Sequence, residues 1–202
     1  MKILAIEQKS EAWFQARLGK VTASKVSNII TPTGKKSTSA QNYMDELLAE
    51  YIAGKPIDVM EPTAWMAHGN EFEAEARSAY SFITDNEVKE VGFCMDDNET
   101  MGISPDGLID PDGGLEIKCV KGSTLISYYR KGFPLTYKPQ VMMSLYVTGR
   151  KWWDFMAYHQ NLRPYIERIN RDDEYIELMG KFLVEFNEKL AKAKDDLKEW
   201  RV

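Results

Sequence analysis

One stretch of sequence decides the fold, and it reads Ser104-Pro105-Asp106-Gly107-Leu108-Ile109-Asp110-Pro111-Asp112-Gly113-Gly114-Leu115-Glu116-Ile117-Lys118-Cys119. Its middle combines a proline, which fixes one φ angle, with glycines that permit positive ones, and this predicts a turn over 110–114. Side chains alternate between the two faces of a strand. We therefore expect Leu115, Ile117 and Cys119 to face the core, and Glu116 and Lys118 to project together from the other face.

Asp106 should come close to this polar pair when the hairpin folds back. With the turn centred near Pro111 or Asp112, position 106 falls opposite positions 116 to 118, where side chains of neighbouring strands interact. A Pro-Asp-Gly sequence at a strand bend also re-aims a side chain. The sequence therefore predicts a cluster of Asp106, Glu116 and Lys118.

Two carboxylates and an ammonium group suit the hydrolysis of a phosphodiester. Carboxylates are hard oxygen ligands for Mg²⁺, which polarises phosphoryl oxygens and lowers the pKa of a bound water. A lysine can orient that water or offset charge in the transition state. The alternative is a surface ion pair across the strands, worth about 0–1 kcal/mol. The Pro-Asp-Gly bend favours the catalytic interpretation, because a plain ion pair does not need it.

The rest of the chain is expected to form an α/β fold with a central mixed sheet flanked by helices. Amphipathic spacing and capping residues predict six helices, over residues 10–18, 40–53, 63–83, 123–131, 138–148 and 172–202. Period-two runs predict strands over residues 87–95, 100–103, 115–120, 152–158 and 165–170. The polar segment 31–39 is expected to be a loop. No linker or repeat interrupts the pattern, so residues 1–202 are expected to form a single domain.

The composition sets limits on partners and location. The formal net charge of −5 argues against a simple nucleic-acid coat but allows a nuclease whose acids surround metal. Cys94 and Cys119 lie in apolar runs without metal-type spacing, so two buried thiols in a reducing compartment are expected. The apolar start, Met1–Glu7, is too short for a signal peptide or a membrane span. A cytoplasmic protein is therefore expected.

Several segments, in chain order, narrow the interpretation to one family. Pro105-Asp106, followed ten positions later by Glu116-Ile117-Lys118, resembles the PD-(D/E)XK nuclease signature. The other segments are Ala12–Gly19 with Thr22–Ser24, Gly69–Glu73 with Ala76-Arg77, Ser104–Leu108 with Leu115–Cys119, and Gln140–Thr148. Together they resemble the motifs of the phage lambda exonuclease family, also called the viral recombinase exonucleases.

This resemblance implies a nuclease core and a 5′→3′ exonuclease acting on double-stranded DNA, which yields mononucleotides and a 3′ single-stranded tail for recombination by strand annealing. It implies Mg²⁺ as the cofactor, with Mn²⁺ as a possible substitute, and a single-strand annealing protein as partner. It also implies a trimeric ring, which would retain DNA without a basic surface. A phage-encoded member would act in the cytosol of its bacterial host.

The resemblance also assigns roles to individual residues. Asp106, Glu116 and the Ile117 carbonyl would be metal ligands, and Glu73 would add a carboxylate at a second metal position. Lys118 would activate the water or stabilise charge, and Gln140 would line the same site. The positions that would hold the 5′-terminal phosphate are Arg17, Ser24 and Ser104. An arginine fork and hydroxyl donors suit a phosphate.

Each assignment has a simpler alternative. Glu73 could lie on a solvated helix face, Arg17 could complement a helix dipole, Ser24 could cap a helix, and Gln140 could be exposed. No function is assigned to His68. The apolar stripe of the last helix could dock a partner, although packing on its own core is favoured: Ile176, Met179, Phe182, Leu183 and Phe186.

Two other functions remain open at this point. One is a PD-(D/E)XK endonuclease of defence or repair, which the core signature does not separate from an exonuclease. The other is a non-catalytic protein that binds DNA ends. The phosphate-binding positions favour the exonuclease over the first, and the complete Asp106, Glu116 and Lys118 set argues against the second.

Overall fold

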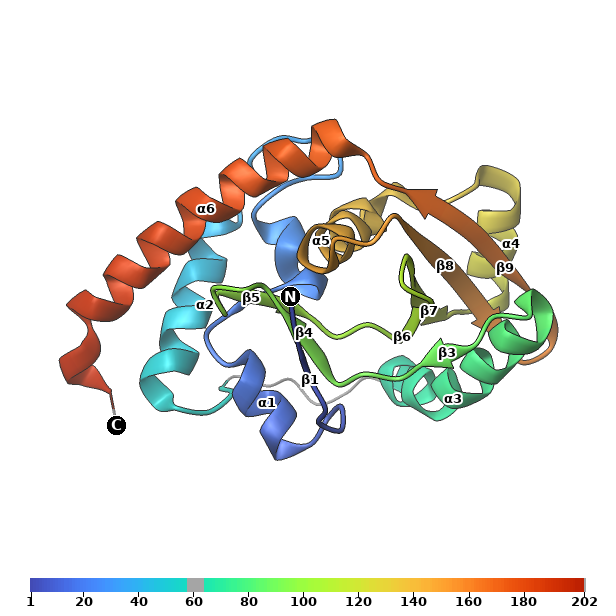
Figure 1. Ribbon diagram of the computed structural model, residues 1–202, viewed down its shortest axis with the longest axis horizontal. Coiled ribbons are helices and arrows are strands. Elements are labelled where there is room, and N and C mark those ends of the chain that lie inside the picture. The colour runs from blue at the N-terminus through green and yellow to red at the C-terminus, as the bar shows by residue number, and fades with distance from the viewer. Residues whose placement is uncertain (58–63, 202) are drawn as a thin grey trace.

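The computed structural model describes residues 1–57 and 64–201 of the chain, and the side chains of 1–57 and 71–201 (Figure 1). The helices are α1 (Glu11–Arg17), α2 (Ala40–Ala53), α3 (Ala64–Thr84), α4 (Gly122–Lys131), α5 (Lys138–Thr148) and α6 (Asp173–Asp196). Three short 3₁₀ helices are η1 (Ala23–Asn28), η2 (Leu135–Tyr137) and η3 (Lys198–Trp200). The strands are β1 (Lys2–Leu4), β2 (Val21–Thr22), β3 (Val88–Lys89), β4 (Phe93–Met95), β5 (Met101–Ile103), β6 (Gly107–Ile109), β7 (Gly113–Cys119), β8 (Trp152–His159) and β9 (Leu162–Asn170).

A five-stranded mixed sheet, in the order β3-β6-β7-β8-β9, carries the decisive hairpin. Its β7–β8 pair is parallel and its other pairs are antiparallel. Alternating side chains send Leu115, Ile117 and Met156 toward α3, while Phe155 and Ala157 pack on the α4 side. Helices therefore cover both faces of this sheet, which confirms the expected α/β class.

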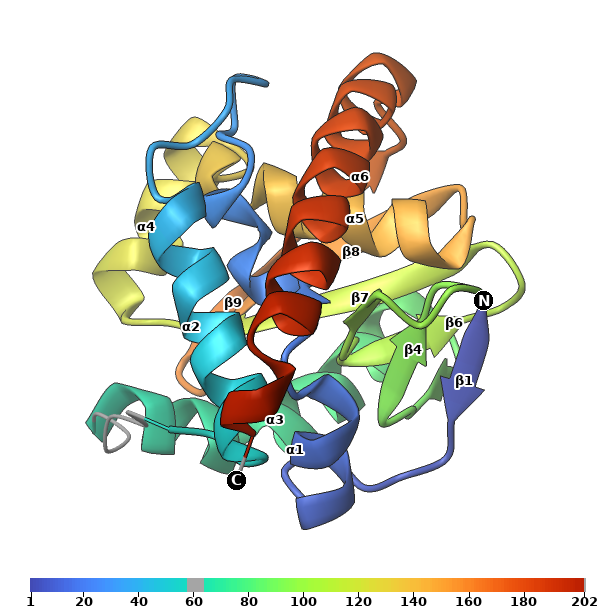
Figure 2. The same ribbon diagram turned by 90° about the vertical axis from the view of Figure 1, so that its left-hand side faces the viewer.

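A second sheet, in the order β1-β4-β5-β2, lies beside the first and is also mixed. Its β2–β5 pair is parallel, whereas β1–β4 and β4–β5 are antiparallel. The largest apolar cluster joins this sheet to α2, α5, α6 and η1. Figure 2 shows α6 lying along α2 and across α5, so that α6 closes this side of the core.

The helices largely agree with the predicted ranges, and Ser10 caps α1 by accepting a hydrogen bond from the Trp13 N–H at 3.2 Å. The start predicted for the third helix, at Thr63, lies outside the described residues. The single strand predicted over 87–95 is wrong, because the segment divides into β3 and β4, which belong to different sheets. Gly92 lies at the break, where a Cβ would come within 1.9 Å of the Ile6 carbonyl oxygen.

We expect Gly92→Ala to destabilise the fold by about 3 kcal/mol, because the clash is with backbone that cannot move aside cheaply. Gly180→Ala is the matched control. A Cβ at Gly180 meets only the Tyr146 ring at 3.4 Å, and replacing a helical glycine by alanine is favourable. Urea denaturation of both variants measures the difference. Equal stability of Gly92→Ala and the native chain would contradict the close approach.

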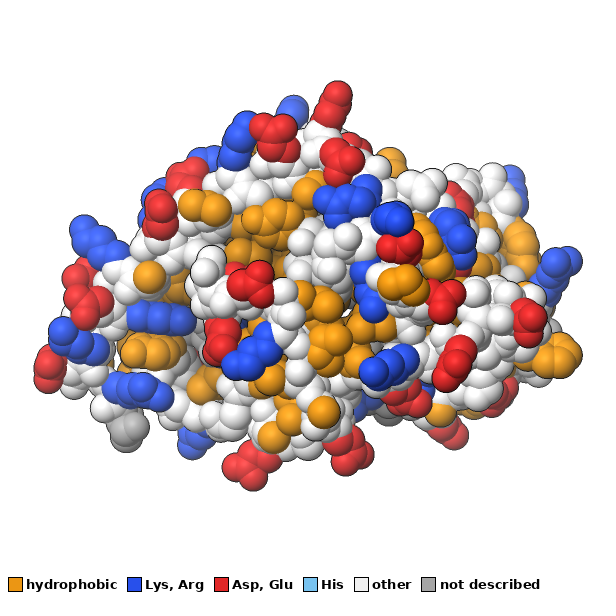
Figure 3. All heavy atoms as spheres, in the orientation of Figure 1, with side chains coloured by type: hydrophobic (Ala, Val, Ile, Leu, Met, Phe, Trp, Pro, Cys, Tyr) orange, Lys and Arg blue, Asp and Glu red, His pale blue; other side chains and the backbone are white. Residues whose placement is uncertain are grey.

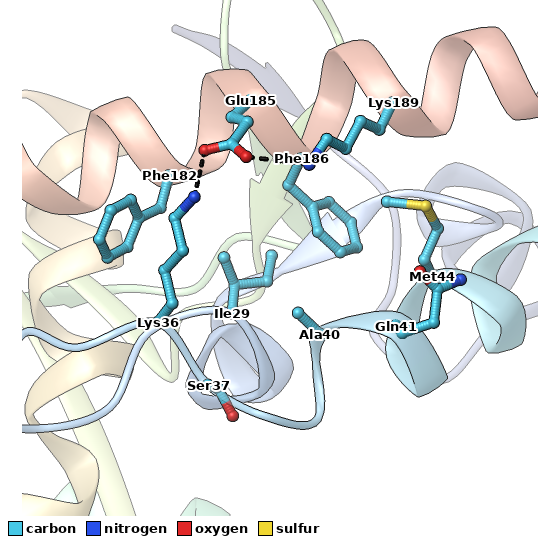
Figure 4. A pocket seen from close by; sticks show the side chains of 10 residues that line it. All are labelled: Ile29, Lys36, Ser37, Ala40, Gln41, Met44, Phe182, Glu185, Phe186 and Lys189. Atoms are coloured by element: carbon cyan, nitrogen blue, oxygen red, sulfur yellow. Dashed lines mark hydrogen bonds and ion pairs between the residues drawn. The ribbon is translucent and has the colours of Figure 1, made fainter.

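The apolar stripe of α6 packs mainly on the protein's own core, as the favoured alternative predicted. Ile176, Met179, Leu183 and Phe186 are buried, and Phe182 is partly buried. Figure 4 shows Phe182 and Phe186 on either side of a small groove of about 150 Å³, with the Lys36–Glu185 ion pair at its rim. Little of the stripe is therefore left to dock a partner.

Candidate active site

The β6–β7 hairpin holds Asp106 against β7. Gly107 pairs with Leu115, and the Asp106 N–H donates to the Leu115 carbonyl at 3.2 Å, so Asp106 stands opposite Glu116. The Asp106 carboxylate in turn accepts a hydrogen bond from the Ile117 N–H at 2.5 Å. The hairpin therefore places the Asp106 carboxylate against β7, as we predicted from the turn and the alternation of side chains.

Glu116 and Lys118 share the face of β7 that lies toward α5. They form an ion pair, although Glu116 is buried, with only 5% of its side chain exposed. Gln140, in the first turn of α5, donates from Nε2 to Glu116 Oε1 at 2.7 Å. The Lys118 ammonium also lies 5.3 Å from the centre of the Tyr137 ring. The structure therefore brings together Asp106, Glu116, Lys118 and Gln140.

Glu73, on α3, approaches the same cluster from the other side but is held by two cations. Its Oε1 accepts from Arg77 Nη2 at 3.1 Å and its Oε2 lies 3.3 Å from Lys9 Nζ. Arg77 Nε also donates to the Asp106 carbonyl at 2.8 Å, which ties α3 to the hairpin. Glu73 is partly buried and engaged in this network, whereas its neighbours Glu71 and Glu75 are exposed.

Charge crowding shifts the pKa values of the cluster. Burial, and then the Glu116 charge, raise the pKa of the Asp106 carboxyl to about 8. Burial alone would lower the pKa of Lys118, but the charges of Glu116 and Asp106 outweigh it and raise that pKa above its ordinary value. Lys118 is therefore an ammonium group at neutral pH.

In EDTA, we expect the contribution of Asp106 to the stability of the native chain to fall as the pH rises from about 4 to about 8. Over that interval the unfolded state releases the Asp106 proton while the folded state retains it, so folding becomes less favourable. Asp106→Asn lacks this titration and should gain in melting temperature relative to the native chain as the pH rises. Parallel melting curves of the two proteins across this range would contradict the shift.

Arg17 and Ser104, which lie far apart in the sequence, meet in a second polar cluster. Arg17 Nη1 donates to the Ser104 hydroxyl at 2.8 Å, and Trp13 Nε1 donates to the same oxygen at 2.9 Å. The guanidinium lies 4.2 Å from the centre of the Trp13 ring. Burial lowers the pKa of Arg17, yet arginine stays charged in proteins. Because the Ser104 oxygen accepts twice, its O–H is left to donate to a ligand.

Ser24 reaches the same edge of the smaller sheet by strand register. Thr22 of β2 pairs with Gly102 of the parallel strand β5, so both chains leave the sheet in the same direction, one toward Ser24 and the other toward Ser104. Ser24 is exposed, and its hydroxyl lies 3.4 Å from the Thr22 hydroxyl. The 3₁₀ helix η1 begins before it, with Thr22 at the N-cap, so Ser24 is not the helix cap of the simpler alternative.

The cluster suits one hard cation. Among the described residues, no three His, Cys, Asp or Glu side chains gather closely enough to form a metal site by themselves. Two carboxylates are nevertheless a normal protein contribution to Mg²⁺, which keeps several waters and takes phosphate oxygens as further ligands. Asp106 and Glu116 therefore fit this ion, whereas Glu73 would first have to leave its cations.

Other expectations are met in part. Cys94 is buried as predicted, but Cys119 is only partly buried because it lies near the end of β7.

No helix within the described ranges is long and apolar enough to cross a membrane. Figure 3 shows acidic and basic side chains interspersed on this face, without a broad basic patch.

Sequence reasoning missed three residues around these two clusters. Tyr137 lies beside Lys118, Arg77 bridges Glu73 and the Asp106 backbone, and Trp13 holds Ser104. Trp13 and Arg77 stand inside the motifs that carry the family resemblance, which is the only signal that could have drawn attention to them. Tyr137 stands three residues before Gln140, outside those motifs.

The fold and the carboxylate–lysine hairpin define a protein of the PD-(D/E)XK nuclease class. A model of the YqaJ-like viral recombinase domain matches residues 12–151, more than half of the chain. The chain therefore belongs to this family, which is the phage lambda exonuclease family that the motifs resemble.

Solved structures agree with this assignment. An alkaline exonuclease from Laribacter hongkongensis is 36% identical, with a TM-score of 0.84 over 94% of this chain and 97% of the other. The structure of the same exonuclease in complex with dAMP gives a TM-score of 0.79 at 36% identity over 94% and 99%. A phage-related exonuclease from Haemophilus somnus 129PT, 14% identical, shares the fold at a TM-score of 0.65 over 88% and 96%. No curated protein matched the sequence.

Proposed function

We propose that this chain is a Mg²⁺-dependent 5′→3′ exonuclease on double-stranded DNA, which releases mononucleotides and leaves a 3′ single-stranded tail for strand annealing. The observation that carries the proposal is the neighbouring position of two polar clusters. The Asp106–Glu116–Lys118 cluster and the Arg17–Ser104 pair are joined by the single residue Pro105. We propose the whole of residues 1–202 as one nuclease domain.

In this proposal, one set of residues binds the 5′-terminal phosphate and another set holds the metal ion. Arg17, Ser104 and Ser24 would bind the 5′-terminal phosphate and align the strand. Asp106, Glu116 and the Ile117 carbonyl would hold Mg²⁺, and Glu73 would complete a second position. The bound cation would polarise the scissile phosphate and acidify a water.

Lys118 has two conceivable roles, activation of the water and stabilisation of charge. Because the charges of Glu116 and Asp106 keep its ammonium protonated, its position favours charge stabilisation. Gln140 would hold Glu116 in place through its hydrogen bond. Mn²⁺, which accepts the same oxygen ligands, would substitute for Mg²⁺.

The relative at 36% identity supports this proposal, since it is an alkaline exonuclease by name. The test compares linear duplex DNA with closed circular duplex DNA, with Mg²⁺ and with EDTA. Release of acid-soluble nucleotide from linear DNA alone, and only with Mg²⁺, is the expected result. Cleavage of the circle would instead favour the endonuclease, and binding of ends without cleavage would favour the non-catalytic alternative.

We expect the active form to be a closed ring, most simply a homotrimer. The chain has a net charge of −5, so electrostatic retention of DNA by one subunit should be weak. A ring holds DNA topologically, and it requires head-to-tail interfaces that close. Light scattering behind a sizing column should give about three times the mass of the chain, and a stable monomer with and without DNA would contradict it.

The single-strand annealing protein is proposed as a further partner, to be tested by co-purification.

A further inference from the structure

The sequence separates acidic from basic residues along the middle of the chain. Residues 71–116 contain thirteen Asp or Glu and two Lys or Arg, whereas residues 117–153 contain seven Lys or Arg and no acid. The first segment includes the described side chains of α3, and the second includes α4. Because α3 and α4 pack on opposite faces of the five-stranded sheet, the two sides of this sheet present opposite charges to the solvent (Figure 1).

The solvent side of α3 presents acids together with an exposed aromatic ring. Exposed positions recur along this helix and its end at spacings of four and three, which places their side chains on one stripe. Phe82 is 89% exposed, more than any other large apolar side chain among the described residues, and Ile83 beside it is 51% exposed. We call this surface the α3 stripe, and its members are Glu71, Glu75, Ser78, Phe82 and Asp85.

The solvent side of α4 presents a different apolar surface. Ile126 and Tyr129 are 48% and 46% exposed and stand three residues apart, so they lie on the same side of the helix. Leu162, at the start of β9, extends this surface, because a Cβ on Gly122 would come within 3.2 Å of its Cδ1. The Tyr129 hydroxyl donates to the Arg163 carbonyl at 3.1 Å, which joins α4 to β9. We call the three apolar side chains the α4 patch.

The cations beside the α4 patch have no acidic partner within the described part of the chain. Arg130, Lys131 and Arg163 are exposed, and none of them forms an ion pair with a described residue. The nearby acid Glu167 is occupied, because it accepts hydrogen bonds from the Tyr165 hydroxyl and from a backbone N–H. The α4 patch therefore has positive charge at its edge that the chain itself leaves unpaired.

We propose that the α3 stripe of one copy of this chain binds the α4 patch of the next copy, in a head-to-tail interface. Phe82 would meet the apolar side chains of the α4 patch, and the acids of the stripe would meet the cations at its edge. An apolar centre with a polar rim is typical of protein interfaces, and complementary charge selects the partner and its orientation.

The positions of the two surfaces suit repeated assembly. Because the α3 stripe and the α4 patch lie on opposite faces of the sheet, one copy can bind a neighbour on each side at the same time. An interface between two different surfaces closes into a ring when its rotation allows. The inference goes beyond the proposed function, because it concerns assembly and would hold whether or not the chain digests DNA.

The test weakens each surface separately and then mixes the two variants. Phe82→Ser weakens the α3 stripe and Ile126→Ser weakens the α4 patch. Both side chains are exposed in a single copy, so the fold should survive, which circular dichroism checks. Trp200→Ser is the matched control, because Trp200 is 72% exposed and lies outside both surfaces. Light scattering behind a sizing column measures the mass of each protein, alone and in an equimolar mixture.

Phe82→Ser and Ile126→Ser should each shift the mass from that of the native oligomer to that of the monomer, whereas Trp200→Ser should keep the native mass. Their mixture should give a dimer, because each variant keeps one intact surface and the two can form one native interface. Arg130→Glu, which places an acid opposite acids, should also favour the monomer, and more strongly at low salt.

Three results would overturn the inference. If Phe82→Ser or Ile126→Ser keeps the native mass, or if their mixture stays monomeric, these two surfaces do not bind each other, and a ring would have to use other surfaces. A native chain that is a stable monomer would overturn both the ring and this interface. If Arg130→Glu keeps the native mass but binds duplex DNA more weakly in EDTA, the α4 patch is a DNA surface instead. Digestion of linear DNA by the native chain tests the exonuclease separately.

Discussion

Lys118→Ala should lower the rate of DNA digestion by about 100-fold or more, because a group that stabilises transition-state charge is commonly worth that much. Lys118 is the only cation that pairs with Glu116 among the described side chains, and it lies on the same face of β7. Asp106→Ala and Glu116→Gln should have comparable effects. Glu116→Gln is the sharpest of these variants, because the amide oxygen can still accept the hydrogen bond of Gln140 while one negative charge is lost.

The measurement is release of acid-soluble nucleotide from linear duplex DNA at saturating Mg²⁺, with circular dichroism to verify the fold. Lys35→Ala, in the exposed loop over 31–39, is the charge-matched control and should digest DNA at the native rate. Near-native turnover by Lys118→Ala would mean that the cluster is a structural ion pair and that the site lies elsewhere.

Arg17→Ala should slow digestion from 5′-phosphorylated ends by about 10- to 100-fold, because charge-assisted hydrogen bonds are worth about 1.5–3 kcal/mol. Ends that carry a 5′-hydroxyl lack the charged partner, so they should be slowed much less. Ser104→Ala should act in the same direction but more weakly, since it removes one hydroxyl and leaves the guanidinium.

Competing single-turnover digestions of the two kinds of end measure this discrimination directly. Arg17→Lys is the control for charge, because it keeps the cation but loses the planar fork and the stacking on Trp13. Equal slowing of both ends by Arg17→Ala would make Arg17 a structural residue, which holds α1 against β5 through Ser104.

The β6–β7 hairpin could be predicted because residues close together in the sequence determine it. Turn residues at 110–114 and the alternation of Leu115, Glu116, Ile117 and Lys118 determine the register between Gly107 and Leu115. Helices with strong capping residues could be predicted equally well, as Ser10 and α1 illustrate. Apolar strand residues alone, however, do not say to which sheet a strand belongs. The segment over 87–95 therefore appeared to be one strand, although its two ends pair in different sheets.

The contacts between distant segments could not be derived from spacing. Arg17 and Ser104 are separated by 87 positions, and only their place in family motifs predicted that they would act together. The position of Lys9 against Glu73 depends on a left-handed residue, which no pattern in the sequence indicates. Such contacts arise from how the two sheets are set against each other, and that is a property of the whole fold.

Pro105 fixes the distance between two groups that the proposed enzyme would use, Ser104 and Asp106. Ser104 follows β5 and Asp106 precedes β6, so the group that would hold the end of the strand and the group that would direct the cut are two residues apart. Two residues of chain span at most about 7 Å, and the proline ring locks one of the intervening torsions. The length removed at each step would thus be set by covalent geometry rather than by a loop that could stretch. With this fixed spacing, the proposed exonuclease would remove the same number of nucleotides at each cleavage, whatever the sequence of the DNA.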